Sequence, residues 1–422
     1  MGAKGSGERP VRTKRPGEMT VIPTEPESPA QRFTRRQLIY QGAVLAAALG
    51  VAPGILAACG GTTGTTAAAA SGSASPGGDI SGTISFFSWQ GYDLIDIPAM
   101  KSWCKENGVV VKSTYINMGD DITAKFTTGG GKGVYNLSTY FQGYGPFYAS
   151  LNIPTPLDLS RVPNFKKAYP FFQTGPSAET WWLIKGKQLC TPFTWGLMGL
   201  NYDSEKTKAP TSYLDLLQPQ YKNKVGIVDD VIAAMVIGAH IKGIFRTDSL
   251  YTPAQADQIL SYWYELKKNA RTIIPSYGNM ADQFVSGEII VGVPGWAAVN
   301  SFAAGKGDKS VMHTLPQEGA GAFVDGYMIP PEASGVDTVY AWINQAFDPK
   351  VQAQTAEYLV QGAVIPEAVP LMSAEAQKLY PYDQIADILT KSAPLEAIPF
   401  VVPDGYANWE YWNKAWTTFK AS

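Results

Sequence analysis

Histidine, the residue that most often builds metal and acid–base centres, is almost missing from this sequence of 422 residues. The two histidines, His240 and His313, are far apart and have no neighbours at metal-ligand spacing. We therefore expect neither a histidine-based metal site nor a histidine general base, and both side chains are expected to be structural. No cofactor is predicted.

An excess of charge of either sign is also absent. Lysine and arginine total 34 against 36 for aspartate and glutamate, so the chain has no basic field that would draw it onto nucleic acid. Nucleic acid is excluded as an expected partner.

The motifs of common enzyme classes are absent as well. No nucleophile elbow is found, and Gly129-Gly130-Gly131 lacks the Lys-Ser or Lys-Thr of a phosphate-binding loop. The glycine run is predicted to be a simple loop. We expect a protein that is not an enzyme, although an enzyme on a similar fold stays open as an alternative.

Residues 1–59 have the layout of an export signal. A polar, positively charged leader precedes the paired Arg35-Arg36, and an apolar run from Ala43 to Ala58 follows them, as in twin-arginine signals. The run ends in Leu56-Ala57-Ala58-Cys59, which resembles the cleavage site of bacterial lipoproteins and makes Cys59 the predicted lipidated residue. The alternative is an uncleaved membrane helix over Leu38–Ala58.

A flexible tether is predicted for residues 60–79, because Gly, Thr, Ala and Ser dominate there and cannot bury apolar surface. The rest of the protein would then sit at the periplasmic or extracytoplasmic face of the cell membrane. Cys104 and Cys190 could pair in that oxidising location, but their spacing does not establish a disulfide.

Strands and helices alternate from residue 80 onward, which favours α/β lobes with mainly parallel sheets. Strands are predicted at Ile84–Phe87, Val109–Val111 and Val225–Val228, and helices at Ile95–Glu106 and from Thr252-Pro253 to Lys268. Ligands gather at strand ends in such sheets, so the segments just after strands are the candidate sites. Aromatic residues recur at helical intervals near the C-terminus and are assigned mainly to the buried face of a helix: Tyr406, Trp409, Tyr411, Trp412 and Trp416.

A series of motifs resembles the spermidine/putrescine-binding proteins, which have the two-lobed type II periplasmic binding protein fold of ABC importers. The motifs occur in the family's order along nearly the whole chain after the tether: Phe86-Phe87-Ser88-Trp89-Gln90-Gly91-Tyr92, Lys112–Tyr115, Pro192–Gly196, Pro210–Leu216, Tyr221-Lys222, Asp229-Asp230, Ser286–Glu288, Leu315–Gly319 and Phe323–Asp325.

The resemblance implies an α/β protein of two lobes, a hinge and a cleft between the lobes. The first lobe would hold residues 80–194 plus 320–370, and the second residues 199–317 plus 371–422. The connecting strands near Trp195 and Gly319 would form the hinge, and lobe closure would be the signal read by an ABC permease in the membrane. We expect a monomer.

The expected solute is a small organic cation such as a polyamine, because carboxylates would balance its charge and ring faces would pack its methylenes. The resemblance assigns the carboxylates to Asp230 and Asp325, on opposite walls. It assigns rings to Trp89, Tyr92 and Tyr144, with Tyr140 left open as a second candidate for the last position. Helix capping by Asp230 and turn stabilisation by Asp325 are the structural alternatives.

Several positions depart from the family pattern. Gly91 and Ala233 stand where spermidine binders carry acids, and the family's second-lobe tryptophan aligns at Gly295, so Trp296 beside it is the expected ring. Phe323 and Ala363 replace a tryptophan and a tyrosine. A different solute therefore stays open: a sugar, an amino-acid derivative, thiamine or ferric iron.

Overall fold

The computed structural model describes residues 2, 80–116 and 119–422. Apart from Gly2, the predicted export signal, Cys59 and the tether lie outside the described residues.

Within the described residues, one mixed sheet of ten strands organises the fold, and its main path runs β2-β1-β3-β11-β6-β9-β7-β8. The strands of this path are β1 (Gly82–Ser88), β2 (Val109–Tyr115), β3 (Leu137–Phe141), β6 (Thr191–Asp203), β7 (Val225–Val228), β8 (Ala270–Ile274), β9 (Val291–Trp296) and β11 (Gly321–Met328). Off the path, β10 (Val311–Thr314) and β12 (Gly362–Ala363) pair with β6, while β4 (Leu183–Ile184) and β5 (Lys187–Gln188) form a separate hairpin.

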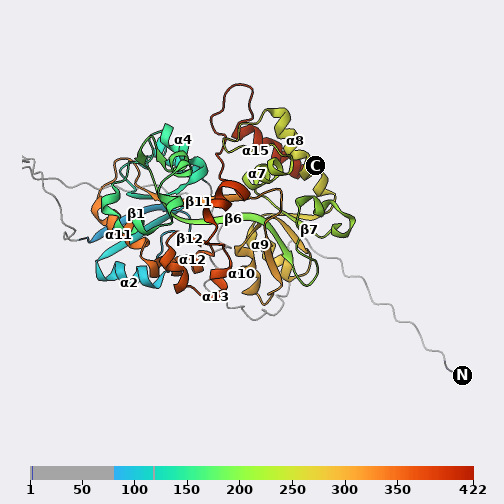
Figure 1. The fold of residues 1–422 in the computed structure, drawn as a ribbon, viewed down its shortest axis with the longest axis horizontal. Helices are drawn as coiled ribbons and strands as arrows, with labels where there is room; N and C mark the ends of the chain where they lie inside the picture. The colour runs from blue at the N-terminus through green and yellow to red at the C-terminus, as the bar shows by residue number, and fades with distance from the viewer. Residues whose placement is uncertain (1, 3–79, 117–118) are drawn as a thin grey trace, which may run out of the picture. The chain divides into compact units, whose positions relative to one another are not determined.

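The sheet has two parallel ends joined by antiparallel strands. We call the part around β1, β2 and β3 the first lobe and the part around β7, β8 and β9 the second lobe; pairing within each set is parallel. β6 and β11 are antiparallel to each other and run between the two lobes (Figure 1). Since β6 pairs with β11 and β12 near its start and with β9 and β10 near its end, one continuous strand connects the lobes.

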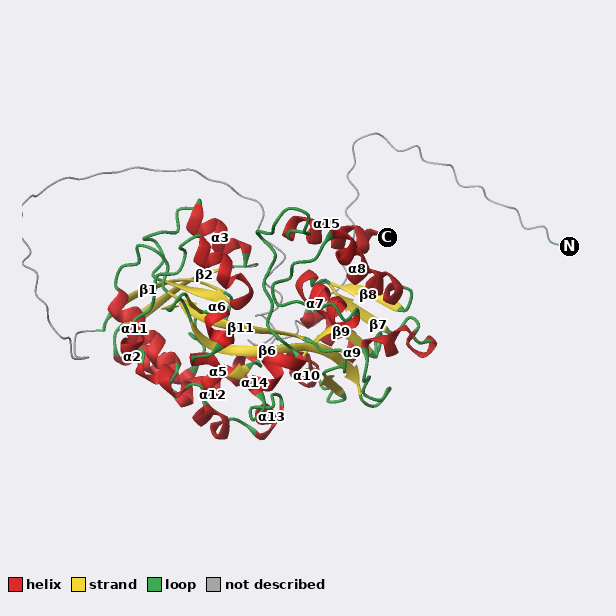
Figure 2. Cartoon of the chain, turned by 45° about the horizontal axis from the view of Figure 1, so that its top comes forward, coloured by secondary structure: helices red, strands yellow, loops and turns green. Residues whose placement is uncertain are grey.

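Helices cover both faces of the strands (Figure 2). The bounds of the α-helices are α2 Pro98–Glu106, α3 Asp120–Thr127, α4 Gly145–Ser150, α5 Pro170–Gln173, α6 Pro176–Trp181, α7 Val231–Ile241, α8 Pro253–Lys267, α9 Tyr277–Val285, α10 Ala298–Ala304, α11 Val336–Ala346, α12 Pro349–Leu359, α13 Ala374–Lys378, α14 Ile385–Asp387 and α15 Trp409–Ala421.

Local sequence signals account for where two of the predicted helices begin. Thr252 and Gln255 form a capping box ahead of α8, with Pro253 in the first turn, so that helix begins where the sequence predicts. The helix predicted from Ile95 instead begins at Pro98. Proline favours the first helical turn and forces the residue before it into an extended conformation, as seen for Ile97 with ψ 116°.

The C-terminal stretch, residues 371–422, contacts both β6 and the second lobe. Tyr380 packs against Trp195 of β6 with ring centroids 5.0 Å apart, whereas Trp416 of α15 packs against Trp263 of α8 at 5.6 Å. Trp409, Trp412 and Trp416 are buried on one face of α15, as predicted. The assignment of Tyr406 to that face is wrong, because this residue precedes the helix and is 38 % exposed.

Cys104 and Cys190 are both free, with Cys104 half-buried and Cys190 buried. Among residues 80–116 and 119–422, no group of His, Cys, Asp and Glu could hold a metal ion. No helix in the same part of the chain is long and apolar enough to span a bilayer.

Candidate functional site

A cavity of about 520 Å³ lies between the two lobes, and all six ligand residues predicted from the sequence line it. Trp89 and Tyr92 follow β1, Asp325 lies in β11, and Asp230 follows β7. Tyr144 and Trp296 complete the set. The structure thus brings together residues that are as much as 236 positions apart, from Trp89 to Asp325.

Asp325 is an aspartate of the cavity wall, and no described residue of that wall is Lys, Arg or His. Asp325 is 5 % exposed, and its Oδ2 accepts a hydrogen bond of 2.5 Å from the Tyr92 hydroxyl. Its Oδ1 is buried and has no hydrogen-bond partner within the described residues. Burial raises the pKa of Asp325 to about 7, although the hydrogen bond from Tyr92 acts in the opposite direction. The proposed turn-stabilising role does not apply, since Asp325 lies inside a strand, at a bulge between β11 and β6.

Tyr92 is positioned by the turn after β1. Gly91 has φ +90°, a conformation that glycine adopts without strain, and the turn directs the Tyr92 side chain into the protein, where it is 6 % exposed. Its ring packs edge-on against Phe193, and its hydroxyl also contacts the Gln361 side chain at 3.1 to 3.3 Å. Tyr92 therefore fixes Asp325 while forming part of the wall.

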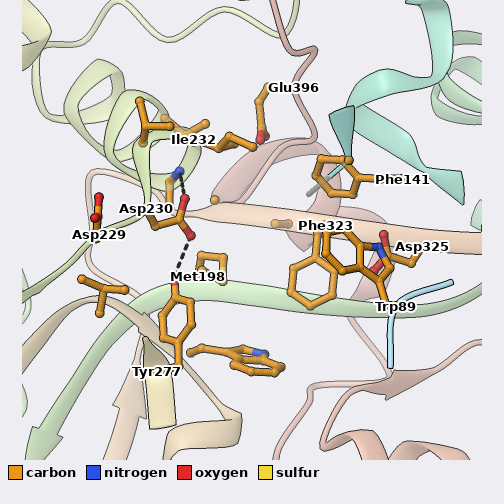
Figure 3. A pocket seen from close by; sticks show the side chains of 18 of the residues that line it. Trp89, Phe141, Met198, Asp229, Asp230, Ile232, Tyr277, Phe323, Asp325 and Glu396 are labelled. Atoms are coloured by element: carbon orange, nitrogen blue, oxygen red, sulfur yellow. Dashed lines mark hydrogen bonds between the residues drawn. The ribbon is translucent and has the colours of Figure 1, made fainter. Parts of the chain in front are cut away.

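Asp230 is both a helix cap and a residue of the cavity wall. Its Oδ1 accepts from the Ala233 main-chain N–H of α7 at 3.0 Å, and its Oδ2 accepts from the Tyr277 hydroxyl at 2.8 Å. Burial raises the pKa of Asp230, and these hydrogen bonds lower it in part. The capping alternative is thus correct, and it coexists with a position at the cavity (Figure 3).

Asp229, the neighbour of Asp230, has a different role. It pairs with Lys420 of α15 at 2.7 Å and accepts a hydrogen bond of 2.8 Å from the Trp416 indole. Although Asp229 also borders the cavity, its charge is already balanced, so Asp230 is the better candidate for a ligand contact.

Aromatic rings occupy the space between the two aspartates. Figure 3 shows Asp230 and Asp325 on opposite sides of the pocket, with the rings of Phe323, Phe141 and Trp89 toward the Asp325 side. Apolar surface of this kind suits the methylene chain of a ligand, and the ring faces suit its cationic ends.

Trp296 lines the cavity one position after Gly295, where the resemblance aligns the family's tryptophan. A Cβ at Gly295 would lie 2.3 Å from the main chain of Leu200, so no side chain fits there. Trp296, the last residue of β9, lines the cavity and packs edge-on against Tyr277 with ring centroids 5.6 Å apart.

Tyr140 and Tyr144, the two tyrosines left open by the sequence, differ in their position relative to the cavity. Tyr144 lines the cavity, and its hydroxyl donates to Asp120 at 3.0 Å. Tyr140 is fully buried away from the cavity lining and donates to the main-chain oxygen of Trp181.

Glu396 is a cavity residue that the sequence analysis missed. It is 2 % exposed, and its Oε2 has no hydrogen-bond partner among the described residues. Burial, assisted by the nearby charge of Asp230, raises the pKa of Glu396 to about 8. The available signal was a single acid inside the apolar, proline-bounded run Ala393–Phe400. Tyr277 and Phe141 were also missed.

The charged side chains that line the cavity are all acidic. Asp230, Asp325 and Glu396 line it, whereas none of its described lining residues is Lys, Arg or His. His240 and His313 lie elsewhere, and burial lowers the pKa of each to about 4. A buried carboxylate without a counter-charge is costly, so the arrangement favours a positively charged occupant.

Comparisons with known proteins agree with the sequence resemblance. The curated relatives include the spermidine/putrescine-binding periplasmic protein 1 of Haemophilus influenzae, 26% identical over 320 residues that cover 74% of this chain and 83% of the relative. The putrescine-binding periplasmic protein PotF of Escherichia coli is 25% identical over 324 residues, covering 71% and 83%.

The fold is likewise that of periplasmic binding proteins. The Tp0655 (TpPotD) lipoprotein of Treponema pallidum matches with a TM-score of 0.65 at 16% identity, covering 81% of this chain and 100% of the other. The prediction of a two-lobed α/β fold is confirmed. The family model of bacterial extracellular solute-binding proteins matches residues 139–385, more than half of the sequence. The chain therefore belongs to the bacterial extracellular solute-binding proteins.

Proposed function

We propose that this protein captures a small organic cation, such as a polyamine, and presents it to an ABC permease. The observation that carries the proposal is Asp325, a buried carboxylate with an unpartnered oxygen at a cavity whose described lining includes no basic residue. A protonated amine beside Oδ1 would supply both the missing hydrogen bond and the missing charge. The printed names of the curated relatives support the same class of solute.

The ligand contacts are proposed as follows. Asp325, fixed by Tyr92, binds one cationic group, and Asp230 faces the ligand from the second lobe. Trp89, Tyr144 and Trp296 provide rings for the chain between.

Binding is proposed to act by lobe closure. The two lobes are taken as residues 80–194 plus 320–370 and 199–317 plus 371–422, and they move about the crossing strands β6 and β11. A ligand that touches Asp325 and Asp230 together stabilises the closed arrangement, because neither lobe alone offers both contacts.

The location is proposed from the N-terminal sequence. Export by the twin-arginine route, followed by acylation of Cys59, would hold a monomeric binding protein at the outer face of the membrane, without a cofactor and without enzymatic turnover. Mass spectrometry of the native protein should then show a mature chain that begins at a lipidated Cys59; an intact leader with an unmodified Cys59 would contradict this part.

Calorimetric titration tests the solute class. Putrescine, spermidine and agmatine are compared with a sugar, thiamine, an amino acid and ferric citrate. We expect an amine to bind, and Asp325→Asn or Asp230→Asn to weaken it by about 2–5 kcal/mol, as for loss of one partner of a buried charge pair. Asp404→Asn, at an exposed position outside the cavity, is the matched control and should change nothing.

Two outcomes would contradict the proposal. A neutral or anionic solute could bind tightly while every amine fails, or both asparagine variants could bind the amine as well as the wild-type protein does. Turnover of the bound solute would instead favour an enzyme.

A further inference from the structure

The segment that carries Glu396 is held by both lobes. We call residues 393–408 the crossing segment. The main-chain N–H of Ala397 donates to Thr247 of the second lobe at 2.8 Å, and that of Ile398 donates to Gly143 of the first lobe at 2.9 Å. Glu396 therefore lies where the chain passes from one wall of the cavity to the other.

The surroundings position the Glu396 main chain while leaving part of its carboxylate unpaired. The Gln142 side chain donates to the main-chain oxygen of Glu396 at 3.0 Å, which fixes the residue. The side chain points toward the pocket from above in Figure 3, and its Oε2 is buried without a hydrogen-bond partner among the described residues. A buried, well-positioned acceptor that faces a cavity indicates an occupant that donates to it.

In the part of the chain that the structure describes, no Lys, Arg or His lines the cavity beside Glu396. Asp230 at the start of α7 acts on it as a like charge, and Tyr251 lies close enough to interact electrostatically. Asp325 of β11 shares the cavity. Tyr277 of α9 donates to Asp230, and Tyr144 donates to Asp120 of α3.

The basic group near Asp230 is already engaged. Lys420 of α15 pairs with Asp229, the residue next to Asp230. Arg246, beside Thr247, pairs with Asp248, and none of the described residues that line the cavity is Lys, Arg or His, so the cavity wall offers no basic group to balance a negative Glu396.

An acid in this setting keeps its proton near neutral pH. Burial opposes the charged form of Glu396, and the negative charge of Asp230 opposes it further. A cation that enters the cavity reverses both effects, because it supplies the missing charge and donates to Oε2.

We propose that Glu396 is a specificity-determining residue that exchanges its proton for a cationic group of the ligand, so that capture releases this proton to solvent. The inference rests on the proposed function and extends it. A ligand with a second cationic group satisfies Glu396 as well as Asp325, whereas a monoamine satisfies only one of them. The cleft therefore selects diamines over monoamines.

Calorimetry in two buffers of different ionisation enthalpy measures the exchange. Putrescine is the probe and butylamine the monoamine comparison, titrated into wild-type protein, Glu396→Gln and Glu410→Gln. Glu410 is exposed on α15 and outside the cavity lining, so Glu410→Gln removes the same charge without touching the cavity.

At pH 7 we expect the wild-type protein to release protons when putrescine binds, and Glu396→Gln to release about one fewer. Its putrescine affinity should fall about 10- to 100-fold, as for a lost hydrogen bond to a charged group, while butylamine affinity changes less than about threefold. The rise of putrescine affinity between pH 6 and pH 7 should be about tenfold smaller in Glu396→Gln than in the wild-type protein. Glu410→Gln should match the wild-type protein in all three measurements.

The experiment distinguishes failure of the proposed Glu396 role from failure of the proposed function. Tight putrescine binding by the wild-type protein without proton release, or the same release and affinity in Glu396→Gln, overturns the role of Glu396 and leaves the proposed function intact. Absence of binding of any amine by the wild-type protein overturns both. If Glu396→Gln fails to fold, the wild-type protein still tests the role: Asp325, whose pKa is raised to about 7, accounts for about half a proton at pH 7, so release clearly above that amount supports Glu396 and release at or below it overturns the role.

Discussion

Removing the charge of Asp325 should make the empty protein more stable while it weakens ligand binding. Asp325→Asn preserves the shape of the side chain, and its Oδ1 can still accept the hydrogen bond from Tyr92. What it removes is a buried carboxylate whose pKa is raised to about 7 from the ordinary 3.8.

The direction of this stability change follows from proton binding to Asp325. Between pH 3.8 and about 7 the folded protein holds a proton on Asp325 that the unfolded chain has released, so the free energy of unfolding falls as the pH rises through this window. Above pH 7 the buried charge costs the wild-type protein about 4 kcal/mol at most, at about 1.4 kcal/mol per pKa unit. Asparagine avoids that cost, although its amide lacks an acceptor, which takes back about 1–3 kcal/mol. The net gain should be about 1–3 kcal/mol at pH 8.

Thermal unfolding of the empty protein at pH 8 and pH 5 measures the effect. We expect Asp325→Asn to melt about 2–6 °C above the wild-type protein at pH 8 and no higher than it at pH 5, where Asp325 is protonated. A saturating amine should raise the melting temperature of the wild-type protein far more than that of the variant. If Asp325→Asn melts below the wild-type protein at pH 8 and keeps the full ligand shift, Asp325 is a structural residue and the reasoning is refuted.

Three further substitutions separate structural from binding roles. Asp203→Asn should destabilise the empty protein, whereas Asp325→Asn stabilises it. Asp203 is buried but paired with Lys206 at 2.7 Å, and its pKa is lowered. The variant should therefore lose about 1–3 kcal/mol of unfolding free energy at neutral pH, measured by urea unfolding. That loss should shrink as the pH falls through the lowered pKa of Asp203, because the wild-type ion pair is then also lost; an equal loss at low pH would contradict it. Trp89→Ala should weaken amine binding about 10-fold or more by calorimetry with little change in melting temperature, since Trp89 is only half-buried at the cavity; unchanged affinity would remove Trp89 from the site. Gly196→Ala places a Cβ 2.3 Å from the ring of Phe323, so that ring must shift and amine affinity should fall; affinity equal to wild type would show that Phe323 is not needed.

The sequence predicted the parts of the fold that local chemistry decides. The short apolar segment Val225–Val228 and the capping box at Thr252 are short-range signals, and both elements form where expected. The resemblance then placed Trp89, Asp230 and Asp325 in one cavity, although nothing local connects these residues.

What the sequence could not reveal depends on long-range packing. Glu396 lies in a stretch without regular secondary structure, and long-range hydrogen bonds hold it at the cavity: Ala397 with Thr247, Ile398 with Gly143, and the Glu396 main chain with Gln142. The sequence analysis left capping and ligand binding open for Asp230, because aspartates in the two positions look the same in a sequence; that Asp230 caps α7 and also lines the cavity is visible only in the structure.

The same carboxylates that would hold a cation should oppose closure of an empty cleft. Asp325 lies on a strand that connects the lobes, and Glu396 lies on a segment bonded to both, so bringing the lobes together would complete the burial of two acids that are already only 5 % and 2 % exposed. Without a ligand, that burial requires either an uncompensated charge or a bound proton, and both oppose closure at neutral pH. A cation removes the penalty at both acids at once, which makes the closed arrangement dependent on the ligand. On this argument the acids would do more than attract the solute: they would also keep an empty protein from adopting the closed shape proposed for a loaded one.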